Sequence, residues 1–248
     1  MAGRPTRAEI NLDALQHNLA LIKKSAGDTK SILAVVKADA YGHGAVRVAR
    51  SLAANRVDFL GVATCDEGVE LRRASISTPI IVLGGAFVEQ GDSVLEHDLI
   101  PVVYNLESAQ ALARSAAAGG TTIKVHIKID TGMGRLGLLP GQIPSFFQEL
   151  SKLKGLEING VLTHLADTNG DSDAGNEFTR RQIELFQQSI EDLSHMGIHP
   201  PYTHLANSAA IMADVSHACN LVRPGIMLYG IHPSKGMKRT IGLEPVMR

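Results

Sequence analysis

Lysine 37 stands where a reactive amine could carry out covalent chemistry. It directly follows the apolar run Ile32–Val36 and precedes the segment ADAYGHG. An ammonium group at the end of a buried strand is costly unless it is paired or neutralised, and burial lowers the pKa of a lysine. A neutral lysine amine is a nucleophile toward carbonyl carbons. The alternative is a lysine at a strand end whose ammonium lies in water, which is the usual situation for this residue type.

A second segment with chemical potential covers residues 127–137, with the sequence IKIDTGMGRLG. It leads from an apolar run into closely spaced glycines, which let a backbone turn sharply and approach a ligand. The spacing does not match a standard dinucleotide fingerprint, and a tight connecting loop is the alternative interpretation. Arg135 is more specific, because a guanidinium among turn glycines suits a fixed oxygen acceptor.

Two later segments carry groups that can bind phosphate. Residues 223–226, Arg-Pro-Gly-Ile, follow the last apolar run, and Gly225 would expose backbone N–H groups to a ligand. Ser208 offers a hydroxyl at the start of a predicted helix, although the pair Asn207-Ser208 is equally typical of plain helix capping. Tyr41 is close enough in sequence to the reactive lysine to reach the same phosphate, or it is a half-buried loop aromatic.

His164 ends a predicted strand and is by default a structural residue. With Asp130, Asp167 and His204 it suggests another interpretation, the metal site of a barrel hydrolase. No His-x-His or His-x-x-x-His spacing supports that interpretation.

Eight short apolar runs alternate with segments of helical spacing. The predicted strands are Ile32–Val36, Phe59–Val62, Ile80–Leu83, Ile100–Val103, Ile123–Ile129, Ile158–Thr163, Thr203–Ala206 and Leu221–Val222. The predicted helices are one with a stripe of Leu15, Leu19 and Ile22 capped by Asp13, then Val46–Ala54, Asp66–Ala74, Leu106–Ala118 and Asn176–Met196. This alternation predicts a parallel sheet with helical crossovers.

The positions of the polar residues favour a closed barrel over the alternative, a doubly wound open sheet. Lys37, Asp130, His164 and Asn207-Ser208 stand at or just after the C-terminal ends of different predicted strands. A barrel gathers these ends around one mouth, whereas an open sheet spreads them along an edge. The predicted fold is therefore α/β, a TIM-type (β/α)8 barrel over residues 1–248.

Composition argues against several classes of partner. The net charge of −1 and the lack of charge runs do not indicate a nucleic-acid surface. No run of about 18 apolar residues predicts a membrane helix, and the first ten residues do not resemble a signal peptide. Cys65 and Cys219 fit free thiols in a reducing cytosol. We expect a cytoplasmic protein that acts on a small molecule, with no nucleic-acid or membrane partner.

Five segments resemble, in order, those of the alanine racemases. They are VVKADAYGHG, KIDTGMGRLG, THLAD with FTRRQIELF, HLANSAA and RPGIMLYG, and the resemblance extends from about Glu9 to the end of the chain. It implies the fold-type III barrel, which binds pyridoxal 5'-phosphate (PLP). It also implies the interconversion of L- and D-alanine, which supplies D-alanine for peptidoglycan.

By motif match, the resemblance also implies residue roles. Lys37 resembles the Schiff-base lysine that is also a base on one face of the substrate. Arg135 resembles the arginine near the cofactor's phenolic oxygen, and Arg223 the arginine that faces the pyridine nitrogen, with His164 supporting it. The residues that look like phosphate ligands are Tyr41, Ser208, Gly225 and Ile226, and Asn207 joins the cofactor-binding set. Lys128 matches a lysine that is carbamylated in some members.

Members of this family continue into a β-rich C-terminal domain, which supplies a catalytic tyrosine to the partner subunit of a head-to-tail homodimer. This sequence ends where that domain would begin, and Tyr104, Tyr202 and Tyr229 do not match that tyrosine. We therefore expect a PLP-binding barrel domain over residues 1–248, without the C-terminal β domain and with low racemase activity. Two alternatives stay open: a stand-alone PLP-binding protein that handles cofactor supply, and the metal-dependent hydrolase.

Overall fold

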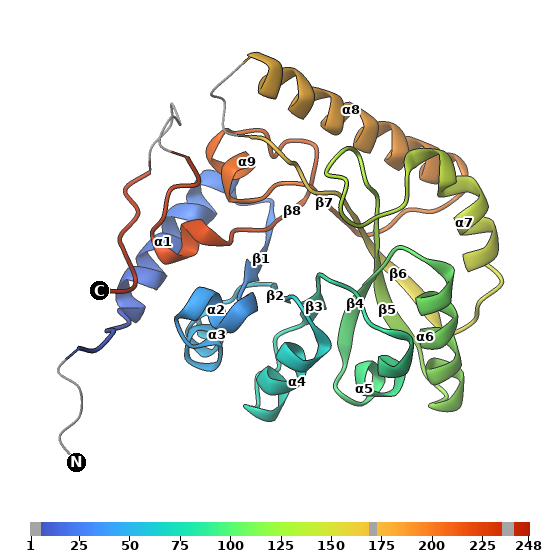
Figure 1. Cartoon of the computed structure of the whole chain (residues 1–248), viewed down its shortest axis with the longest axis horizontal. Coiled ribbons are helices and arrows are strands. Elements are labelled where there is room, and N and C mark those ends of the chain that lie inside the picture. Colours follow the sequence, from blue (N-terminus) through green and yellow to red (C-terminus); the bar gives the residue numbers. More distant parts are fainter. Residues whose placement is uncertain (1–5, 169–172, 235–240) are drawn as a thin grey trace.

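A computed structural model describes residues 6–168, 173–234 and 241–248 and shows eight parallel strands surrounded by helices (Figure 1). The strands are β1 (Ser31–Val35), β2 (Phe59–Val62), β3 (Ile80–Val82), β4 (Leu99–Val103), β5 (Ile123–Lys128), β6 (Leu156–Leu162), β7 (Tyr202–His204) and β8 (Leu221–Val222). Their order in the sheet is β7-β6-β5-β4-β3-β2-β1-β8. The predicted strands are confirmed, with ends that shift by at most two residues.

Backbone contacts between the two outer strands close the sheet into a barrel. Beyond β8, the Arg223 N–H donates to the Ala206 carbonyl over 2.8 Å, and an isolated parallel bridge joins Asn207 to Arg223. Before β8, the Asn220 N–H donates to the Thr203 carbonyl over 3.1 Å. The predicted (β/α)8 barrel is thus confirmed and the open doubly wound sheet is excluded. Closure places the C-terminal ends of all eight strands around one opening.

Alternate residues of the strands fill the barrel interior. On β1, Leu33 and Val35 belong to the interior cluster, whereas Ile32 and Ala34 pack outward against the helices. The buried members of the interior cluster are Leu33, Val35, Phe59, Ile81, Ile100, Val102, Leu162 and Leu221. Because strand side chains alternate with a period of two, a residue two positions beyond an interior residue also faces the barrel axis.

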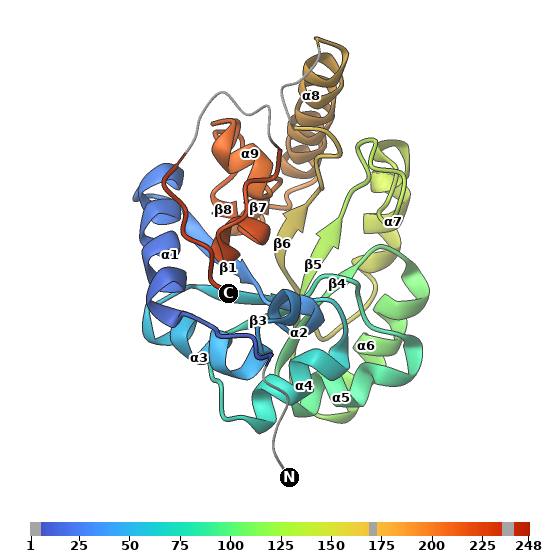
Figure 2. The same cartoon turned by 60° about the vertical axis from the view of Figure 1, so that its left-hand side comes forward.

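Helices form the outer layer of the barrel, as Figures 1 and 2 show from two directions. They are α1 (Leu12–Ala26), α2 (Lys37–Gly42), α3 (Ala45–Ala54), α4 (Cys65–Arg73), α5 (Gly91–Glu96), α6 (Leu106–Ala118), α7 (Ile143–Leu150), α8 (Asp173–His195) and α9 (Ser208–Met212), with 3-10 turns η1 (Val88–Gln90), η2 (Pro140–Gln142) and η3 (Ile226–Tyr229). Within the described ranges, none of these helices has both the length and the apolar composition needed to cross a bilayer.

The predicted cap of the first helix was wrong. Asn11, not Asp13, caps α1: its Oδ1 accepts the N–H groups of Asp13 and Ala14 at 3.0 and 3.1 Å. Asp13 lies in the first turn, where its negative charge still complements the helix dipole. The helix therefore begins before the residue whose type suggested a cap.

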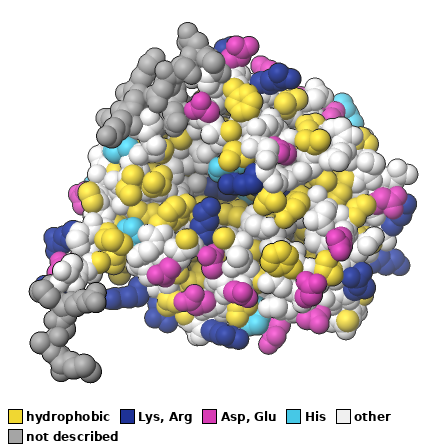
Figure 3. All heavy atoms as spheres, viewed as in Figure 1, with side chains coloured by type: hydrophobic (Ala, Val, Ile, Leu, Met, Phe, Trp, Pro, Cys, Tyr) yellow, Lys and Arg dark blue, Asp and Glu magenta, His cyan; other side chains and the backbone are white. Residues whose placement is uncertain are grey.

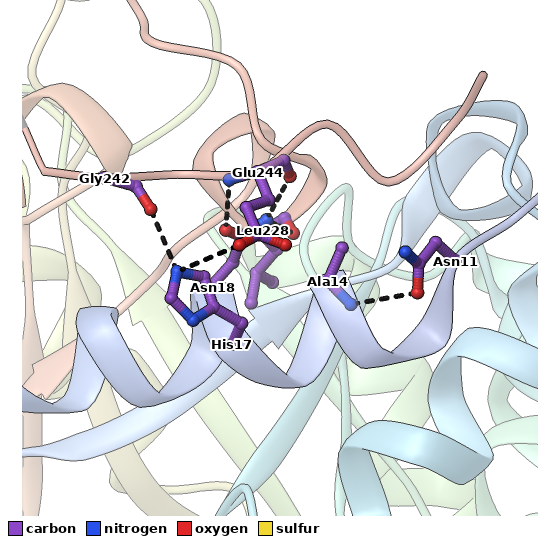
Figure 4. Close-up of polar contacts among 7 residues, drawn as sticks. All are labelled: Asn11, Ala14, His17, Asn18, Leu228, Gly242 and Glu244. Carbon is purple, nitrogen blue, oxygen red and sulfur yellow. Dashed lines mark hydrogen bonds and ion pairs between the residues drawn. The ribbon is translucent and has the colours of Figure 1, made fainter.

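Helix α1 also holds the last described segment of the chain against the barrel (Figure 4). The fully buried Asn18 donates through Nδ2 to the carbonyls of Leu228 and Glu244 at 3.0 and 2.8 Å, and its Oδ1 accepts the Glu244 N–H at 2.8 Å. An antiparallel bridge between Ile10 and Met247 lies further along the same segment. One buried amide thus satisfies three backbone groups that would otherwise be unpaired.

Candidate active site

A cavity of about 440 Å³ opens at the C-terminal end of the barrel. Its lining includes every site residue predicted from the sequence, namely Lys37, Tyr41, Lys128, Arg135, His164, Asn207, Ser208, Arg223, Gly225 and Ile226. These residues come from the ends of β1, β5, β6, β7 and β8 and the loops that follow them. Figure 3 shows a hollow on this face in which Lys and Arg side chains gather, bordered by hydrophobic side chains.

Strand geometry explains why these side chains converge. Three of them lie two residues beyond an interior residue: Lys37 after Val35, His164 after Leu162, and Arg223 after Leu221. The alternation that buries the earlier residue in the barrel therefore aims the later one at its mouth.

The cavity is strongly cationic. Lys37, Lys128, Arg135 and Arg223 line it, and the described lining residues include no Asp or Glu. Burial lowers the pKa of Lys37, the Arg135 charge lowers it further, and Glu67 opposes the shift. Burial, followed by Arg135 and Arg223, lowers the pKa of Lys128 to about 8. The cavity thus suits an anionic ligand, and its lysines give up their protons more readily than free lysine does.

The turn that begins at Lys37 has an unusual backbone handedness. Ala38, Asp39, Ala40 and Tyr41 have φ angles of 51° to 56°, in the left-handed region that L-residues other than glycine rarely adopt. Each such residue costs about 1–2 kcal/mol. This turn was not predicted, because an alanine-rich sequence favours a right-handed helix.

Glu67 holds this left-handed turn in place. Its Oε1 accepts the Ala38 N–H at 2.8 Å and its Oε2 accepts the Ala63 N–H at 2.6 Å. One carboxylate thereby ties the loop after β1 to the loop after β2. Sequence reasoning missed Glu67, although it contacts the backbone next to Lys37.

Arg223 is buried among neutral hydrogen-bond acceptors. Its Nη2 donates to the carbonyls of Thr163 and Leu205 at 2.8 and 3.2 Å and lies 3.3 Å from His164 Nδ1, while its Nη1 lies 3.2 Å from His204 Nδ1. Because a guanidinium can only donate, both Nδ1 atoms must be unprotonated acceptors. Burial and then the Arg223 charge accordingly lower the pKa of His164 to about 3.

The same constraint sets the tautomers of a buried histidine chain. With Nδ1 accepting from Arg223, His204 carries its proton on Nε2 and donates to His126 Nδ1 over 2.8 Å. His126 Nε2 then donates to Asn159 Oδ1 over 3.3 Å. Burial lowers the pKa of His126 to about 4 and that of His204 well below its ordinary value. Gly160 makes room for the chain, since a Cβ there would overlap the His126 ring.

These contacts give the candidate metal ligands other roles. His164 and His204 both accept from the same guanidinium, and Asp130 Oδ1 accepts the N–H groups of Gly132 and Gly134 at 2.9 and 3.1 Å, which shapes the glycine-rich turn. In the described part of the chain, no group of three His, Cys, Asp or Glu side chains is placed to hold a metal. The geometry gives the hydrolase alternative no support.

A small polar hollow lies between the loops after β1, β7 and β8. Ser208 Oγ accepts the Gly225 N–H at 2.9 Å, and a Cβ on Gly225 would lie 2.9 Å from Tyr41 Oη. Glycine is therefore required for the tyrosine hydroxyl to come this close. Burial raises the pKa of Tyr41, so its hydroxyl stays protonated and can donate. Asn207 lines the same cavity, but its side chain caps α9, as the capping alternative proposed.

The fold and this site together define a barrel with a lysine amine in a cationic cavity at its mouth. The chain belongs to the family described by the alanine racemase N-terminal domain, whose model matches residues 10–233. Over 100% and 98% of its length it is 41% and 42% identical to the alanine racemases of Geobacter sp. (strain M21) and Halothermothrix orenii. It spans 66% and 64% of the lengths of these two relatives.

Solved structures give the same result. The alanine racemase of Clostridium difficile 630 in complex with cycloserine has a TM-score of 0.93 at 38% identity, over 100% of this chain and 68% of that chain. The alanine racemase of Bacillus anthracis with bound L-Ala-P has a TM-score of 0.92 at 33% identity, over 100% of this chain and 64% of that chain.

Proposed function

We propose that this chain is the cofactor-binding barrel of an amino-acid racemase that interconverts L- and D-alanine, with PLP held covalently on Lys37. The observation that carries the proposal is the cavity itself, whose described lining holds a lysine of lowered pKa and three further cations but no carboxylate. The names of the relatives and of the matching structures support alanine as the substrate.

The chemistry of the lining residues fits PLP. The Ser208 hydroxyl, the Tyr41 hydroxyl and the backbone of Gly225 and Ile226 would hold the phosphate, because these polar groups line the same side of the cavity and lie close to one another. Arg135 would lie near the phenolic oxygen. The other arginine, at the end of β8, would face the pyridine nitrogen, and since a guanidinium only donates, that nitrogen would have to accept.

The residues of the chain would bind the substrate and move its α-proton, while PLP, when bound, supplies the electron-withdrawing group that stabilises the resulting negative charge. Lys37 Nζ would exchange the proton with the α-carbon on one face. The described tyrosines offer no obvious base for the other face: Tyr104 and Tyr229 donate to the carbonyls of Gly84 and Val35 at 3.2 and 2.9 Å. We therefore propose that residues 1–248 alone exchange the α-proton mainly on one face.

Incubation of the protein with PLP and L- or D-alanine in D₂O tests this proposal. We expect a visible absorption band when PLP is added, loss of the α-proton signal by NMR, and slow appearance of the opposite enantiomer. Since a general base contributes about 10²–10⁴-fold, racemisation should lag behind exchange by a factor in that range. A protein that stays colourless would overturn the PLP site. PLP uptake without any exchange would favour the cofactor-supply alternative, and racemisation as fast as exchange would contradict the one-face mechanism.

In the cell, we propose that the protein acts in the cytoplasm as a homodimer and supplies D-alanine for peptidoglycan. These properties follow from the family resemblance.

Lys128 is expected to form a carbamate with dissolved CO₂. The N–C bond forms on the neutral amine with release of a proton to solvent, and the lowered pKa of about 8 makes that neutral form accessible. The surrounding cations would stabilise the resulting anion, which could orient Arg135.

With ¹³C-bicarbonate, we expect a carbamate NMR signal that is stronger at pH 9 than at pH 6. Lys128→Ala should remove the signal, whereas Lys124→Ala, on the same strand but exposed, should not. Persistence of the signal in Lys128→Ala would assign it elsewhere.

A further inference from the structure

The segment FTRRQIELF on α8 contributes no residue to the cavity lining, yet its Gln182 is completely buried. Gln182 Oε1 accepts the Ala166 N–H at 2.9 Å, and its Nε2 donates to the His164 carbonyl over 3.1 Å. These two backbone partners fix the orientation of the amide, because an N–H needs an acceptor and a carbonyl needs a donor.

This contact continues the hydrogen-bonding pattern of β6 beyond its last residue. In a parallel pair, one residue accepts through its C=O the N–H of a residue on the neighbouring strand and donates its own N–H to the carbonyl two residues earlier on that strand. The Gln182 amide does the same with Ala166 and His164 and so replaces a neighbouring strand. The Gln182 amide thus holds the His164 backbone, while the His164 imidazole contacts Arg223 at the cavity.

The same amide reaches the loop that carries Arg135. Gln182 Nε2 lies 3.4 Å from Thr131 Oγ1, at the start of the glycine-rich turn. Phe178, one turn earlier on α8, packs against the same loop, since a Cβ on Gly132 would lie 3.0 Å from its Cζ. The N-terminal half of α8 therefore contacts two of the loops that line the cavity.

We propose that Gln182 is a positioning residue, which acts on the cavity by fixing the His164 backbone and the start of the Arg135 loop relative to one another. This inference rests on the proposed function, because the ligand whose binding it tunes is PLP. Loss of the amide would remove the hydrogen-bond partner of the His164 carbonyl and of the Ala166 N–H, and with it the link that holds the two loops at their present separation.

The test is PLP affinity, measured by equilibrium titration below the unfolding temperature of every variant. We expect Gln182→Met, which preserves side-chain length but removes all three hydrogen bonds, to weaken PLP binding by about five- to fiftyfold. Gln188→Met is the matched control, because Gln188 lies on the same helix and its hydrogen bond to Asp192 is exposed to solvent. We expect its PLP affinity to equal that of the unaltered protein.

Gln182→Glu should show a pH dependence of PLP binding that a general loss of stability would not produce. A neutral carboxylic acid can accept from Ala166 and donate to His164, whereas a carboxylate cannot donate at all. The ratio of its PLP dissociation constant to that of the unaltered protein should therefore rise with pH, while the ratio for Gln182→Met stays flat. Lys37, Lys128, Arg135, His164 and Arg223 face the same cavity in both proteins, so their titration largely cancels in the ratio.

If the Gln182 variants do not fold, a conservative pair at Thr131 decides. Thr131→Ser keeps the hydroxyl, which contacts both Gln182 and Thr163, and should bind PLP normally, whereas Thr131→Val loses both contacts and should bind it several-fold more weakly. The inference is overturned if Gln182→Met binds PLP as tightly as the unaltered protein does. If the Gln182 variants do not fold, it is overturned when Thr131→Ser and Thr131→Val bind PLP equally well. Failure of the unaltered protein to bind PLP would instead sink the proposed function.

Discussion

Replacement of Lys37 by alanine is expected to abolish covalent retention of PLP and to lower α-proton exchange by about 10²–10⁴-fold or more. The amine of this residue is the group proposed both to attach the cofactor and to move the proton. Its lowered pKa and its place at the cationic cavity make its neutral, nucleophilic form more accessible than that of a free lysine. Borohydride reduction followed by mass spectrometry measures attachment directly, as a mass increase on the peptide that contains residue 37.

Two variants control this experiment. Lys124→Ala removes an exposed lysine of β5 and should leave attachment and exchange unchanged. Lys37→Arg keeps a positive charge but lacks an amine that can be deprotonated, so it should behave like the alanine variant. Stoichiometric attachment in Lys37→Ala, for example on Lys128, would reassign the role of the reactive lysine.

Acidification from pH 6.5 to pH 4 is expected to destabilise the protein by several kcal/mol. His126 and His204 are buried, His164 is partly buried, and all three are neutral; the pKa is about 4 for His126, about 3 for His164 and well below the ordinary value for His204. In the unfolded chain each would bind a proton near pH 6.5. The unfolded state thus binds more protons throughout this window, so the free energy of unfolding falls as the pH falls.

The stabilisation that comes from keeping these three histidines neutral is fully present above pH 6.5, and it is lost as the pH falls toward their folded-state pKa values. Each histidine contributes a slope of at most about 1.4 kcal/mol per pH unit, so the three give up to about 4 kcal/mol per unit. Urea unfolding at pH 7, 6, 5 and 4 measures this slope. His126→Gln should reduce the slope by the contribution of one proton, whereas His195→Gln, at an exposed position, should leave the slope unchanged. A free energy of unfolding that stays constant over this range would contradict the neutral buried chain.

The sequence was sufficient to predict the barrel and the residues of the cavity for a physical reason. Short apolar runs mark strands buried on both faces, and the alternation within each run determines which following residue faces the mouth. The sequence alone showed that Lys37 and Arg223 follow predicted strands, whereas their roles in the cavity were implied by the family resemblance. The cap of α1 was missed because Asn11 and Asp13 are both good capping residues, and the structure alone shows where the helix begins.

The residues that support the cavity were harder to predict. Glu67 follows Thr64 in the T-x-x-E pattern of a capping box, so a local signal existed, but its contact with the loop after β1 depends on tertiary structure. His126 occupies a polar position in the alternating sequence of β5, and its partners are 33 and 78 residues away in the sequence. Gln182 reads as one polar residue of an amphipathic helix, and only packing shows that it faces inward.

In stereochemical terms, residues 38–41 are an L-polypeptide folded with the backbone of its mirror image. D-residues would occupy this region without strain, so the handedness of the turn is imposed by its surroundings, including the Glu67 carboxylate, and not by the residues themselves. The relaxed form of this sequence is a right-handed helix, in which residue 41 would point in a different direction relative to residue 37. The position of Tyr41, the proposed phosphate ligand, relative to Lys37, the proposed attachment point, therefore depends on a strained turn. The Glu67 carboxylate, which lies outside the cavity lining, helps to hold that turn in its strained form.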